Sequence, residues 1–584
     1  MNKWLGLLSF IILFNLVVGQ KTDSDFIILD YKPNATFHVP KIKFNGKISH
    51  ETIIRSLHTI IANLNDNNVG LSLNYVQESP GGFHYSFSQT YRGHKIYQSE
   101  IKATVDRNQT LRAVIDNSLL TKDWQLSPSS SNEEVIFYNY VTSTPEWCFI
   151  NVNEQDEEVV TSRDGDILYK RTLRTYKTAP DSTVVGKIFR PDPITTAQTT
   201  YQGNFKDNNN SNNADLEAQL QTVNFKTNFD GTTFNLENQY IKIVDFDASV
   251  TLPVVSTTPQ FFYNRSQTGF EDVNAFYHLQ NYQQHVKSLG FNLADGTVWA
   301  DTHADGVGDN SYFTPNNLPK RLYFGTGGVD DAEDADVVTH EYGHFLSDEA
   351  APGSNVGNER SSLDEAFGDY IAASYSKSIS SYKSDWVYSW DGHNEFWNGR
   401  IVNSSKKYPI DLSTSIYRNG EMWATALMNI HDEIGRLATD SLIYQNHYAY
   451  GANMAMDDAA YLMIEADTML NNGKYYCPIY RHLLAQGFLP LYTNNPCGIS
   501  SNNDIKENLN VFFYASPQQF AVQLENNISS IIKLYNLNGQ LLETIFPSSS
   551  LTTYNNTRLA NGVYLVQVEN KQLTSSTFKW CKLD

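Results

Sequence analysis

Residues 334–344 read Asp-Ala-Asp-Val-Val-Thr-His-Glu-Tyr-Gly-His, and Glu365 follows twenty-one positions after His344. The acidic start of this stretch is typical of a helix N-terminus. His340 and His344 are four residues apart, so a helix projects both imidazoles from one face, where they can hold one metal ion. Glu341 lies next to that ion and is available to act as a base. The stretch therefore predicts a helix that carries a metal centre.

Residues 361–373 (Ser-Ser-Leu-Asp-Glu-Ala-Phe-Gly-Asp-Tyr-Ile-Ala-Ala) predict a second helix that completes this centre. Glu365 and Asp369 are four residues apart and share one of its faces. Two histidines and one carboxylate leave the fourth position of a tetrahedral zinc ion open for water, as in catalytic sites. Asp369 is placed to accept the second ring N–H of His340 and fix its tautomer. The alternative is two amphipathic helices with ordinary surface side chains.

The region around these helices resembles the thermolysin-type clan of zinc endopeptidases, and most closely its fungalysin-like branch. The resemblance covers roughly residues 180–495. It rests on motifs in the family's order, which are Asn-Ala-Phe-Tyr-His-Leu (274–279), Asp-Asn-Ser-Tyr-Phe-Thr-Pro (309–315), Val-Asp-Asp-Ala-Glu-Asp-Ala-Asp (329–336), His-Glu-Tyr-Gly-His (340–344) and Asp-Glu-Ala-Phe-Gly-Asp (364–369). It implies an α+β fold with a two-lobed catalytic domain, rich in strands in its N-terminal part and helical in its C-terminal part.

The resemblance also implies roles for individual residues. His340, His344 and Glu365 would bind one catalytic zinc ion. Glu341 would be the general base that takes a proton from the zinc-bound water and passes it to the leaving amine. The sequence contains no Gly-x-Ser-x-Gly elbow that would indicate a covalent intermediate. The implied reaction is hydrolysis of peptide bonds in extracellular proteins.

Two related classes of zinc peptidase are excluded by their own motifs. A metzincin would have Gly at position 347 and His at position 350, where this chain has Ser347 and Ala350. An aminopeptidase of the clan would carry a motif that captures the substrate amino terminus, and none precedes the histidines. Asn310 and Ser311 instead match the edge segment that hydrogen-bonds the substrate backbone in endopeptidases of the family.

The chain departs from the family at the residue that donates a hydrogen bond to the tetrahedral intermediate. The family pattern His-x-x-Gly-Glu-x-Trp here reads Tyr-Arg-Asn-Gly-Glu-Met-Trp (417–423), so Tyr417 occupies the histidine position. A phenol can also donate to an oxyanion, and Arg418 adds positive charge nearby. Alternatively, His393 or His447 takes over this role, or activity is reduced and Tyr417 is a buried aromatic at a helix start. A rival function is then a catalytically weak surface adhesin that keeps the peptidase scaffold.

The N-terminus predicts export. Residues 1–19 combine Lys3, an apolar run and small residues before Gln20, as in a secretory signal peptide, with a retained membrane anchor as the alternative. No later segment is long and apolar enough for a membrane span. The net charge of −21 argues against nucleic-acid binding, because phosphates would be repelled.

Residues 20–175 resemble the propeptide that precedes fungalysin and thermolysin catalytic domains. Residues 89–101 predict two strands joined by a turn at Gly93, and the alternation in 101–105 supports the second strand. A second small α+β unit is expected to end with a turn and strand at 164–170. By the resemblance this propeptide would inhibit the enzyme and assist its folding, making the chain a zymogen. The alternative is a permanent accessory domain.

The catalytic domain is expected at 176–497. Its first part, to about residue 255, shows strands and polar turns, with a surface loop at the Asn-rich residues 207–213. Apolar residues with helical spacing then predict helices at 271–289, 334–349, 361–378, 419–437, 453–471 and 475–487.

Acidic residues in this domain suggest calcium as a second cofactor. Asp301, Asp305 and Asp309 lie in a Gly-containing loop, and Asp336 lies one turn before His340, where thermolysin relatives use an Asp for calcium. The alternative is a loop with Asx turns and a solvated helix start.

Four cysteines in an exported chain suit disulfides better than a metal cluster. Cys477 and Cys497 are close enough in sequence to close one loop, with two unbonded buried thiols as the alternative. Cys148 and Cys581 lie in different expected domains.

Residues 505–584 predict a separate β-sandwich. Asn538-Gly539 is the turn of a hairpin within 531–542, and 559–568 reads as a turn followed by a strand. These residues resemble the C-terminal sorting domain of type IX secretion, which implies the type IX machinery as a partner and a secreted or cell-surface location. The alternative is a carbohydrate- or surface-binding sandwich.

Overall fold

The structure is a computed structural model of the chain. It describes residues 35–490 apart from 45–47, 123, 128, 130, 132–133, 140–143, 153–156, 166, 173–180, 248, 305 and 307, and beyond them residues 497, 511–515, 520–524, 530–536, 541–545, 551–554, 559, 562–570 and 575–582. The chain divides into two compact units, Met1–Asn494 and Asn495–Asp584. The expected signal peptide lies outside the described residues. No helix among the described residues is long and apolar enough to cross a membrane.

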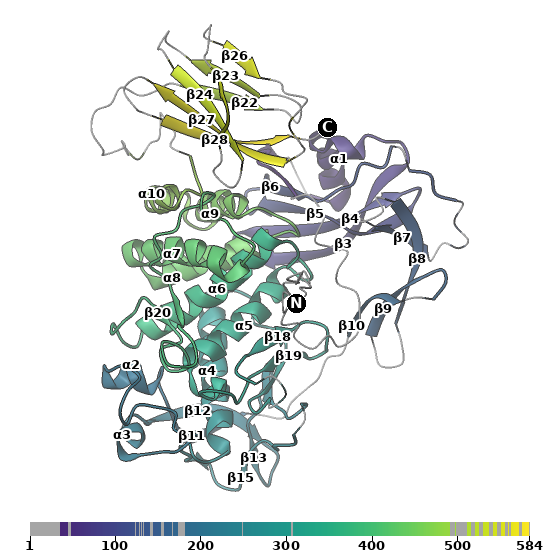
Figure 1. Cartoon of the computed structure of the whole chain (residues 1–584). Coiled ribbons are helices and arrows are strands. Elements are labelled where there is room, and N and C mark those ends of the chain that lie inside the picture. The colour runs from purple at the N-terminus through teal and green to yellow at the C-terminus, as the bar shows by residue number, and fades with distance from the viewer. Residues whose placement is uncertain are drawn as a thin grey trace, which may run out of the picture. The chain divides into compact units, whose positions relative to one another are not determined.

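The first part of the larger unit is a ten-stranded sheet, drawn in purple and blue in Figure 1. Its strands are β1 (Thr36–His38), β2 (Ile42–Lys43), β3 (Val69–Ser79), β4 (Gly82–Tyr91), β5 (His94–Asp106), β6 (Thr110–Asp116), β7 (Glu134–Asn139), β8 (Thr144–Val152), β9 (Glu157–Ser162) and β10 (Ile167–Thr172). The helix α1 (His50–Ile60) packs on it through Ile53 and Leu57. The described residues of the expected second α+β unit form only the strands β7 to β10, since 134–172 lacks a run of apolar residues with helical spacing.

The hairpin expected at 89–101 is present. β4 and β5 are joined at Arg92 and Gly93, which both have positive φ, as a two-residue hairpin turn requires. The alternation in β5 does not mark a solvent-exposed face, however. Lys102 and Thr104 are buried, like the apolar residues on either side of each of them.

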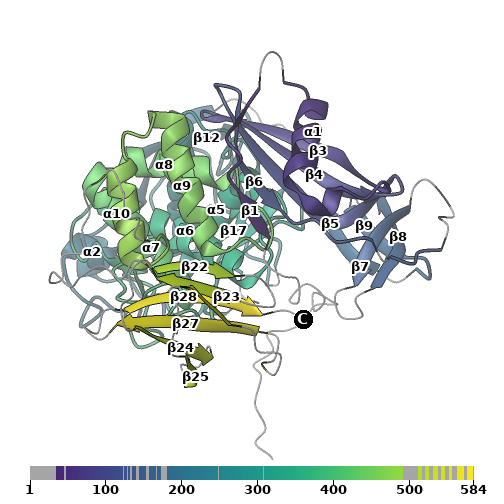
Figure 2. The ribbon, with the colours of Figure 1, turned by 90° about the horizontal axis from the view of Figure 1, so that it is seen from above.

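The polar face of this sheet is buried because it lies against helices of the catalytic region. The amide of Gly81 donates to Gln445 Oε1 at 2.9 Å, and His84 stacks on Tyr448 with ring centroids 5.3 Å apart. Figure 2 shows the helix α9 (Met456–Asn471) beside β6, and Arg112 of that strand lies 3.7 Å from Glu465 of α9. Residues 35–172 therefore share one compact unit with the catalytic region.

The β-rich part of the catalytic region follows. Its elements are β11 (Asp181–Ile188), α2 (Pro193–Ala197), α3 (Ala214–Glu217), β12 (Gln221–Phe229), β13 (Phe234–Asn235), β14 (Ile241–Ile243), β15 (Val255–Ser256), β16 (Gln260–Phe261), β17 (Val298–Asp301), β18 (Tyr312–Thr314) and β19 (Lys320–Tyr323). They form a five-stranded sheet in the order β15-β13-β12-β11-β16 and a four-stranded sheet in the order β14-β17-β19-β18.

The helical part carries the elements of the candidate site. Its elements are α4 (Gly269–Ser288), the short 3-10 helix η3 (Asp331–Glu333), α5 (Ala335–Ala350), α6 (Asn358–Lys377), β20 (Trp386–Val387), β21 (Arg400–Ile401), α7 (Ile416–Ile434), α8 (Arg436–His447), α9 (Met456–Asn471) and α10 (Tyr476–Gln486). The helix expected at 419–437 ends at Ile434 because Gly435 has a φ of 88°, and α8, which the sequence did not predict separately, begins there. Together the sheets and helices confirm the α+β class.

The smaller unit contains only strands among its described residues. These are β22 (Val511–Ala515), β23 (Phe520–Leu524), β24 (Ser530–Asn536), β25 (Leu541–Ile545), β26 (Leu551–Tyr554), β27 (Gly562–Asn570) and β28 (Ser575–Lys582). They form two sheets, β22-β23-β26 and β25-β24-β27-β28, around a core that includes Phe520, Val566 and Trp580. The hairpin expected within 531–542 is β24–β25, while its turn residues Asn538 and Gly539 lie outside the described residues.

The described cysteines have two different states. Cys477 and Cys497 are both disulfide-bonded, so the alternative of two unbonded thiols does not hold. Cys148 is a buried thiol, and burial raises its pKa to about 12. The side chain of Cys581 lies outside the described residues.

Candidate metal centre and active-site cleft

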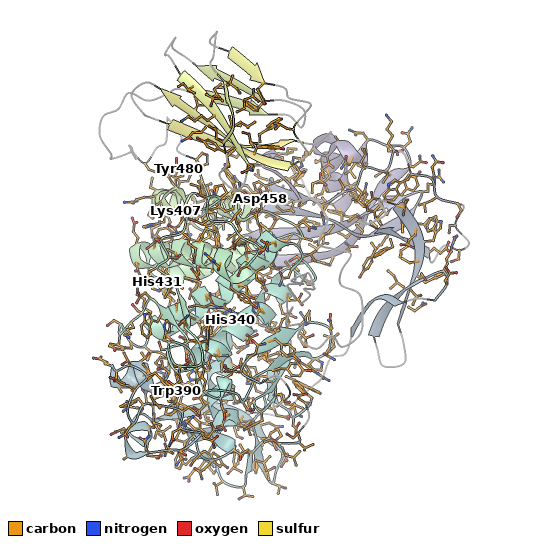
Figure 3. All side chains as sticks on the ribbon, in the orientation of Figure 1. His340, Trp390, Lys407, His431, Asp458 and Tyr480 are labelled. Carbon is orange, nitrogen blue, oxygen red and sulfur yellow. The ribbon has the colours of Figure 1, made fainter. Side chains whose placement is uncertain are left out.

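Two packed helices bring the predicted metal ligands together. On α5 and α6, Nε2 of His340 lies 3.4 Å from Oε2 of Glu365, and Nε2 of His344 lies 3.8 Å from Oε1 of the same residue. The three side chains each offer one ligand atom within 4.8 Å of the others. His340 lies in the interior of the catalytic region (Figure 3). The arrangement can hold one metal ion and leaves room for a further ligand.

Glycines allow α5 and α6 to approach closely at this centre. A Cβ on Gly368 would come within 2.4 Å of Nδ1 of His340. A Cβ on Gly343 would come within 3.1 Å of the Cα of Gly368. Real Cβ contacts are longer than the first of these distances, so the glycine in α6 makes room for the imidazole. The helix contact that positions the ligands thus depends on the absence of a side chain.

A carboxylate contacts the second ring nitrogen of each histidine. Asp369 Oδ1 lies 3.1 Å from Nδ1 of His340, where the sequence analysis expected it. Asp364 Oδ2 lies 2.7 Å from Nδ1 of His344, a role that the sequence analysis missed. Arg360 and Asn355 donate to Asp364 and hold it in place. A signal was available, because Asp364 directly precedes Glu365 and the helix turns it toward α5.

Arg400 on β21 is a further residue that the sequence analysis missed. Its Nη1 lies 3.0 Å from Glu365 Oε2 and 2.9 Å from Asp369 Oδ1. Its guanidinium lies 4.5 Å from the centroid of the Tyr417 ring. The residue lies in a two-residue strand 31 positions beyond Asp369, and nothing in its local sequence marks it.

The charges of this centre are arranged for a cation. Burial alone would lower the pKa of His344, but its hydrogen bond to Asp364 and the charge of that carboxylate raise the pKa to about 10. Burial would raise the pKa of Glu365, yet His340 and His344 lower it to about 2. Burial raises the pKa of Glu341. Glu365 is therefore ionised at neutral pH, and a metal ion would displace the protons of the histidines.

A cleft of about 880 Å³ opens onto the centre. His340, His344, Glu365 and Glu341 line it. Asn310, Ser311 and Tyr417 also line it. Asp369 is fully buried and does not line the cleft.

The edge of a sheet borders this cleft. β18 is the last strand in the order β14-β17-β19-β18 and pairs only with β19 among the described strands. Asn310 and Ser311 directly precede it, and the hydroxyl of Ser311 donates to Asp331. An extended peptide can add to such an edge through main-chain hydrogen bonds.

Of the three donors considered from the sequence, only Tyr417 lines the cleft. It stands at the start of α7 with half of its side chain exposed, and burial raises its pKa, so the phenol keeps its proton. His447 is fully buried, and its Nδ1 lies 2.8 Å from the carbonyl of Ile443. His393 stacks on Trp386 at 3.8 Å between centroids. The two histidines are therefore positioned by other contacts.

The residues considered for calcium do not gather in one place. Asp301 accepts the amide hydrogens of Phe246 and Asp247, and Asp336 accepts the amide of Tyr388 at 2.9 Å. Asp305 lies outside the described residues. Asp309 is exposed and lines the cleft, close to Asp331 and Asp391.

Comparison with known proteins found one curated relative and a solved structure to which the chain is similar. The chain is 22% identical over 495 residues to the extracellular metalloproteinase MEP of Fusarium vanettenii, in an alignment that covers 70% of this chain and 69% of the fungal protein. The chain is similar to a fungalysin-like metalloproteinase. Among solved structures, the precursor of protealysin, a metalloproteinase from Serratia proteamaculans, matches with a TM-score of 0.32 and 12% identity, over 43% of this chain and 87% of that one.

The C-terminal unit has a match of its own. Residues 514–581 match the family of secretion system C-terminal sorting domains. This confirms the sorting domain expected from the sequence over the alternative of a binding sandwich. The chain is therefore a secreted or cell-surface protein that leaves the cell by the type IX route.

Proposed function

We propose that this chain is a secreted zinc-dependent metalloendopeptidase that is made as a zymogen. The observation that carries the proposal is the convergence of His340, His344 and Glu365 in a cleft that also contains Glu341. Two imidazole nitrogens and one carboxylate fit a catalytic zinc ion, which prefers such mixed ligands and keeps a position for water. When bound, zinc supplies Lewis acidity that activates water and polarises the scissile carbonyl.

The chain's own residues then bind and orient the substrate. An extended peptide adds to the edge strand β18 and receives hydrogen bonds at Asn310 and Ser311. This places successive substrate side chains alternately toward and away from the floor of the cleft. Asp309, Asp331 and Asp391 bring three carboxyl groups close together in the lining of the cleft.

Glu341 is the proposed general base. It lines the cleft, one residue from His340, and Oε2 of its buried carboxylate has no hydrogen-bond partner among the described residues. A carboxylate whose pKa is raised by burial is a better proton acceptor at neutral pH than an exposed one. Glu341 takes a proton from the attacking water and later delivers it to the leaving amine.

Tyr417 is the proposed donor to the oxyanion. Its protonated phenol lines the cleft at the start of α7. The guanidinium of Arg400 lies over its ring and adds positive charge to the region where the oxyanion forms. Such donors contribute roughly a hundredfold to a thousandfold in turnover.

The N-terminal sheet is the proposed inhibitory propeptide. Its polar face is buried against the catalytic region through Gly81, His84 and Arg112. Gln77 also donates to the carbonyl of Glu349, at the end of the helix that carries the metal ligands. Cleavage between the two regions would release this contact.

The test is zinc content and casein hydrolysis of the purified mature chain, measured beside Glu341→Gln. We expect about one zinc ion per chain in both proteins and casein hydrolysis only in the wild type. Glu349→Gln, on the same helix but outside the cleft, serves as the matched control and should cleave casein normally. Bound zinc without any hydrolysis that depends on Glu341 would support the rival adhesin and overturn the enzyme.

A further inference from the structure

A second group of acidic side chains lies outside the cleft. Glu271 in the first turn of α4, Asp330 just before η3 and Glu333 at its end each place one carboxylate oxygen within 4.8 Å of the others. All three residues are at most 3% exposed. Three carboxylates this close and this buried repel one another strongly unless a cation or protons neutralise them.

The side chains around this group leave two of its oxygens without a hydrogen bond. Oε2 of Glu271 and Oδ1 of Asp330 are buried and have no hydrogen-bond partner among the described residues. The other oxygen of Asp330 accepts from Asn210 at 2.8 Å, and Glu333 accepts from Trp390, which is labelled in Figure 3. Oε2 of Glu271 lies 3.4 Å from Nε2 of His303, whereas Oδ1 of Asp330 has no partner among the described residues. A buried carboxylate oxygen without a partner is costly, so Oδ1 of Asp330 points to a ligand.

The nearby cations do not balance the charge. Arg265 is fully buried and lies 2.9 Å from Glu333, but its Nη2 also lies 2.6 Å from Asp207. One guanidinium is thus shared between two carboxylates, and it does not neutralise Glu271 and Asp330.

His303 is a second basic group beside this cluster. Its Nε2 lies 3.4 Å from Glu271, and its Nδ1 lies 3.7 Å from Asp272, so it too is shared between two carboxylates. Even with a protonated His303, the five carboxylates around the group face two positive charges.

We propose that Glu271, Asp330 and Glu333 bind a calcium ion. The available ligands are all oxygens, which favours a hard cation over zinc. Calcium tolerates irregular coordination by Asp and Glu, whereas magnesium demands near-octahedral geometry and keeps most of its water. This site shares no residue with the loop and helix start considered from the sequence, and it does not depend on peptidase activity.

The position of the ion suggests what it does. Glu271 belongs to α4, whereas Asp330 and Glu333 belong to the segment that leads directly into α5. An ion bound by all three would fix the start of the helix that carries His340 and His344. Its loss would loosen the metal centre without touching a zinc ligand.

The proposal can be tested by calcium binding to the full chain. Glu341→Gln serves as the background, so that self-cleavage cannot mimic a loss of stability. The protein is stripped of calcium, returned to buffer with constant zinc, and titrated with CaCl2 or MgCl2. Calcium content and the midpoint of thermal unfolding are measured. We expect calcium to be retained on dialysis and to raise the midpoint by several degrees, with a smaller effect of magnesium.

Isosteric variants test whether the calcium ion is bound by these particular carboxylates. Glu271→Gln and Asp330→Asn should each weaken calcium binding at least tenfold and remove most of the thermal shift. Asp309→Asn, in the group of three carboxyls that lines the cleft, is the matched control and should keep both the calcium affinity and the thermal shift.

Several results would overturn the assignment. One is that the protein retains no calcium on dialysis and that added calcium leaves its thermal unfolding midpoint unchanged. The carboxylates would then share protons instead of binding an ion. A larger response to magnesium, or loss of the shift in Asp309→Asn but not in Asp330→Asn, would equally contradict it. The first result is measured in Glu341→Gln alone, so it decides whether calcium binds even if a further variant fails to fold.

Discussion

Oδ2 of Asp364 lies 2.7 Å from Nδ1 of His344, one residue before the carboxylate that faces the same histidine from its other side. The contact between Asp364 and Nδ1 of His344 fixes the tautomer of this histidine so that its Nε2 is available to a metal ion. We expect Asp364→Asn to weaken zinc binding by about tenfold to a hundredfold, because the amide is a weaker acceptor and can present a donor to the ring. Competition with a chelator measures this. Unchanged zinc affinity would mean that Asp364 only holds α6 against α5, through the hydroxyl of Ser347.

Gly368→Ala tests whether close approach of α5 and α6 positions the histidines. Alanine favours a helix over glycine by about 1 kcal/mol, which by itself would stabilise the chain. The added Cβ would lie 2.4 Å from His340, however, and such overpacking costs about 1–3 kcal/mol. We expect a lower unfolding midpoint and weaker zinc binding in the same variant. A higher midpoint with normal zinc affinity would show that the helices move apart without consequence.

Tyr417→Phe removes the phenolic hydroxyl and keeps the ring beneath Arg400. If the hydroxyl donates to the oxyanion, kcat should fall about a hundredfold to a thousandfold with little change in KM. Tyr417→His restores a donor and should recover part of the loss. Steady-state kinetics on one peptide substrate measure all three proteins. A change in KM alone would indicate that Tyr417 only binds the substrate.

The lowered pKa of His84 predicts that the contact between the N-terminal sheet and the catalytic region weakens in acid. Burial lowers its pKa to about 3, so the folded chain holds it neutral, whereas the unfolded chain protonates it near pH 6.5. The stability that His84 contributes is therefore complete above pH 6.5 and is lost as the pH falls through 6.5 toward 3. Hydrogen exchange of β4 and β5 should be faster at pH 5 than at pH 7.

The variant His84→Gln provides the control for this prediction. Glutamine keeps hydrogen-bonding groups near Gln445 and Thr104 but does not titrate. Its exchange should depend less on pH between 5 and 7. Equal pH dependence in both proteins would assign the effect to other groups.

The stability of the calcium-free chain should fall as the pH rises. Burial and repulsion from neighbouring carboxylates raise the pKa of Glu333 to about 7 and that of Asp330 to about 9. Both values exceed the unfolded-state values of about 4, so the folded chain holds protons that the unfolded chain has lost. The stabilisation is complete below about pH 4 and is lost as the pH rises through 7 and 9. Arg265 and His303 face this group and oppose the effect in part.

Calcium should remove this pH dependence by replacing the protons. The rise in unfolding midpoint on adding CaCl2 should therefore be small at pH 5 and largest near pH 9, measured in the Glu341→Gln background. Asp330→Asn should flatten the calcium-free profile. A calcium response that shrinks with rising pH would contradict the site.

Local patterns predicted much of the fold. The helical spacing of apolar residues gave α4, α5, α6, α9 and α10 to within a few residues of their observed ends. The turn expected at Gly93 predicted the β4–β5 hairpin, because such a turn depends on the conformation of only two residues, here Arg92 and Gly93. The break at Gly435 was missed, since a single glycine does not by itself end a periodic helix.

In the candidate site, too, some residues could be predicted from local spacing, whereas others depend on contacts between distant segments. The sequence by itself determined which side chains can share one helix face, namely His340 with His344 and Glu365 with Asp369, because helical geometry fixes spacings of four residues. Only the tertiary structure decided that Arg400 joins Glu365, that the polar face of β5 is buried, and that Glu271 meets Asp330 and Glu333. These contacts join segments tens of residues or more apart, and they depend on how whole elements pack, which no local periodicity encodes.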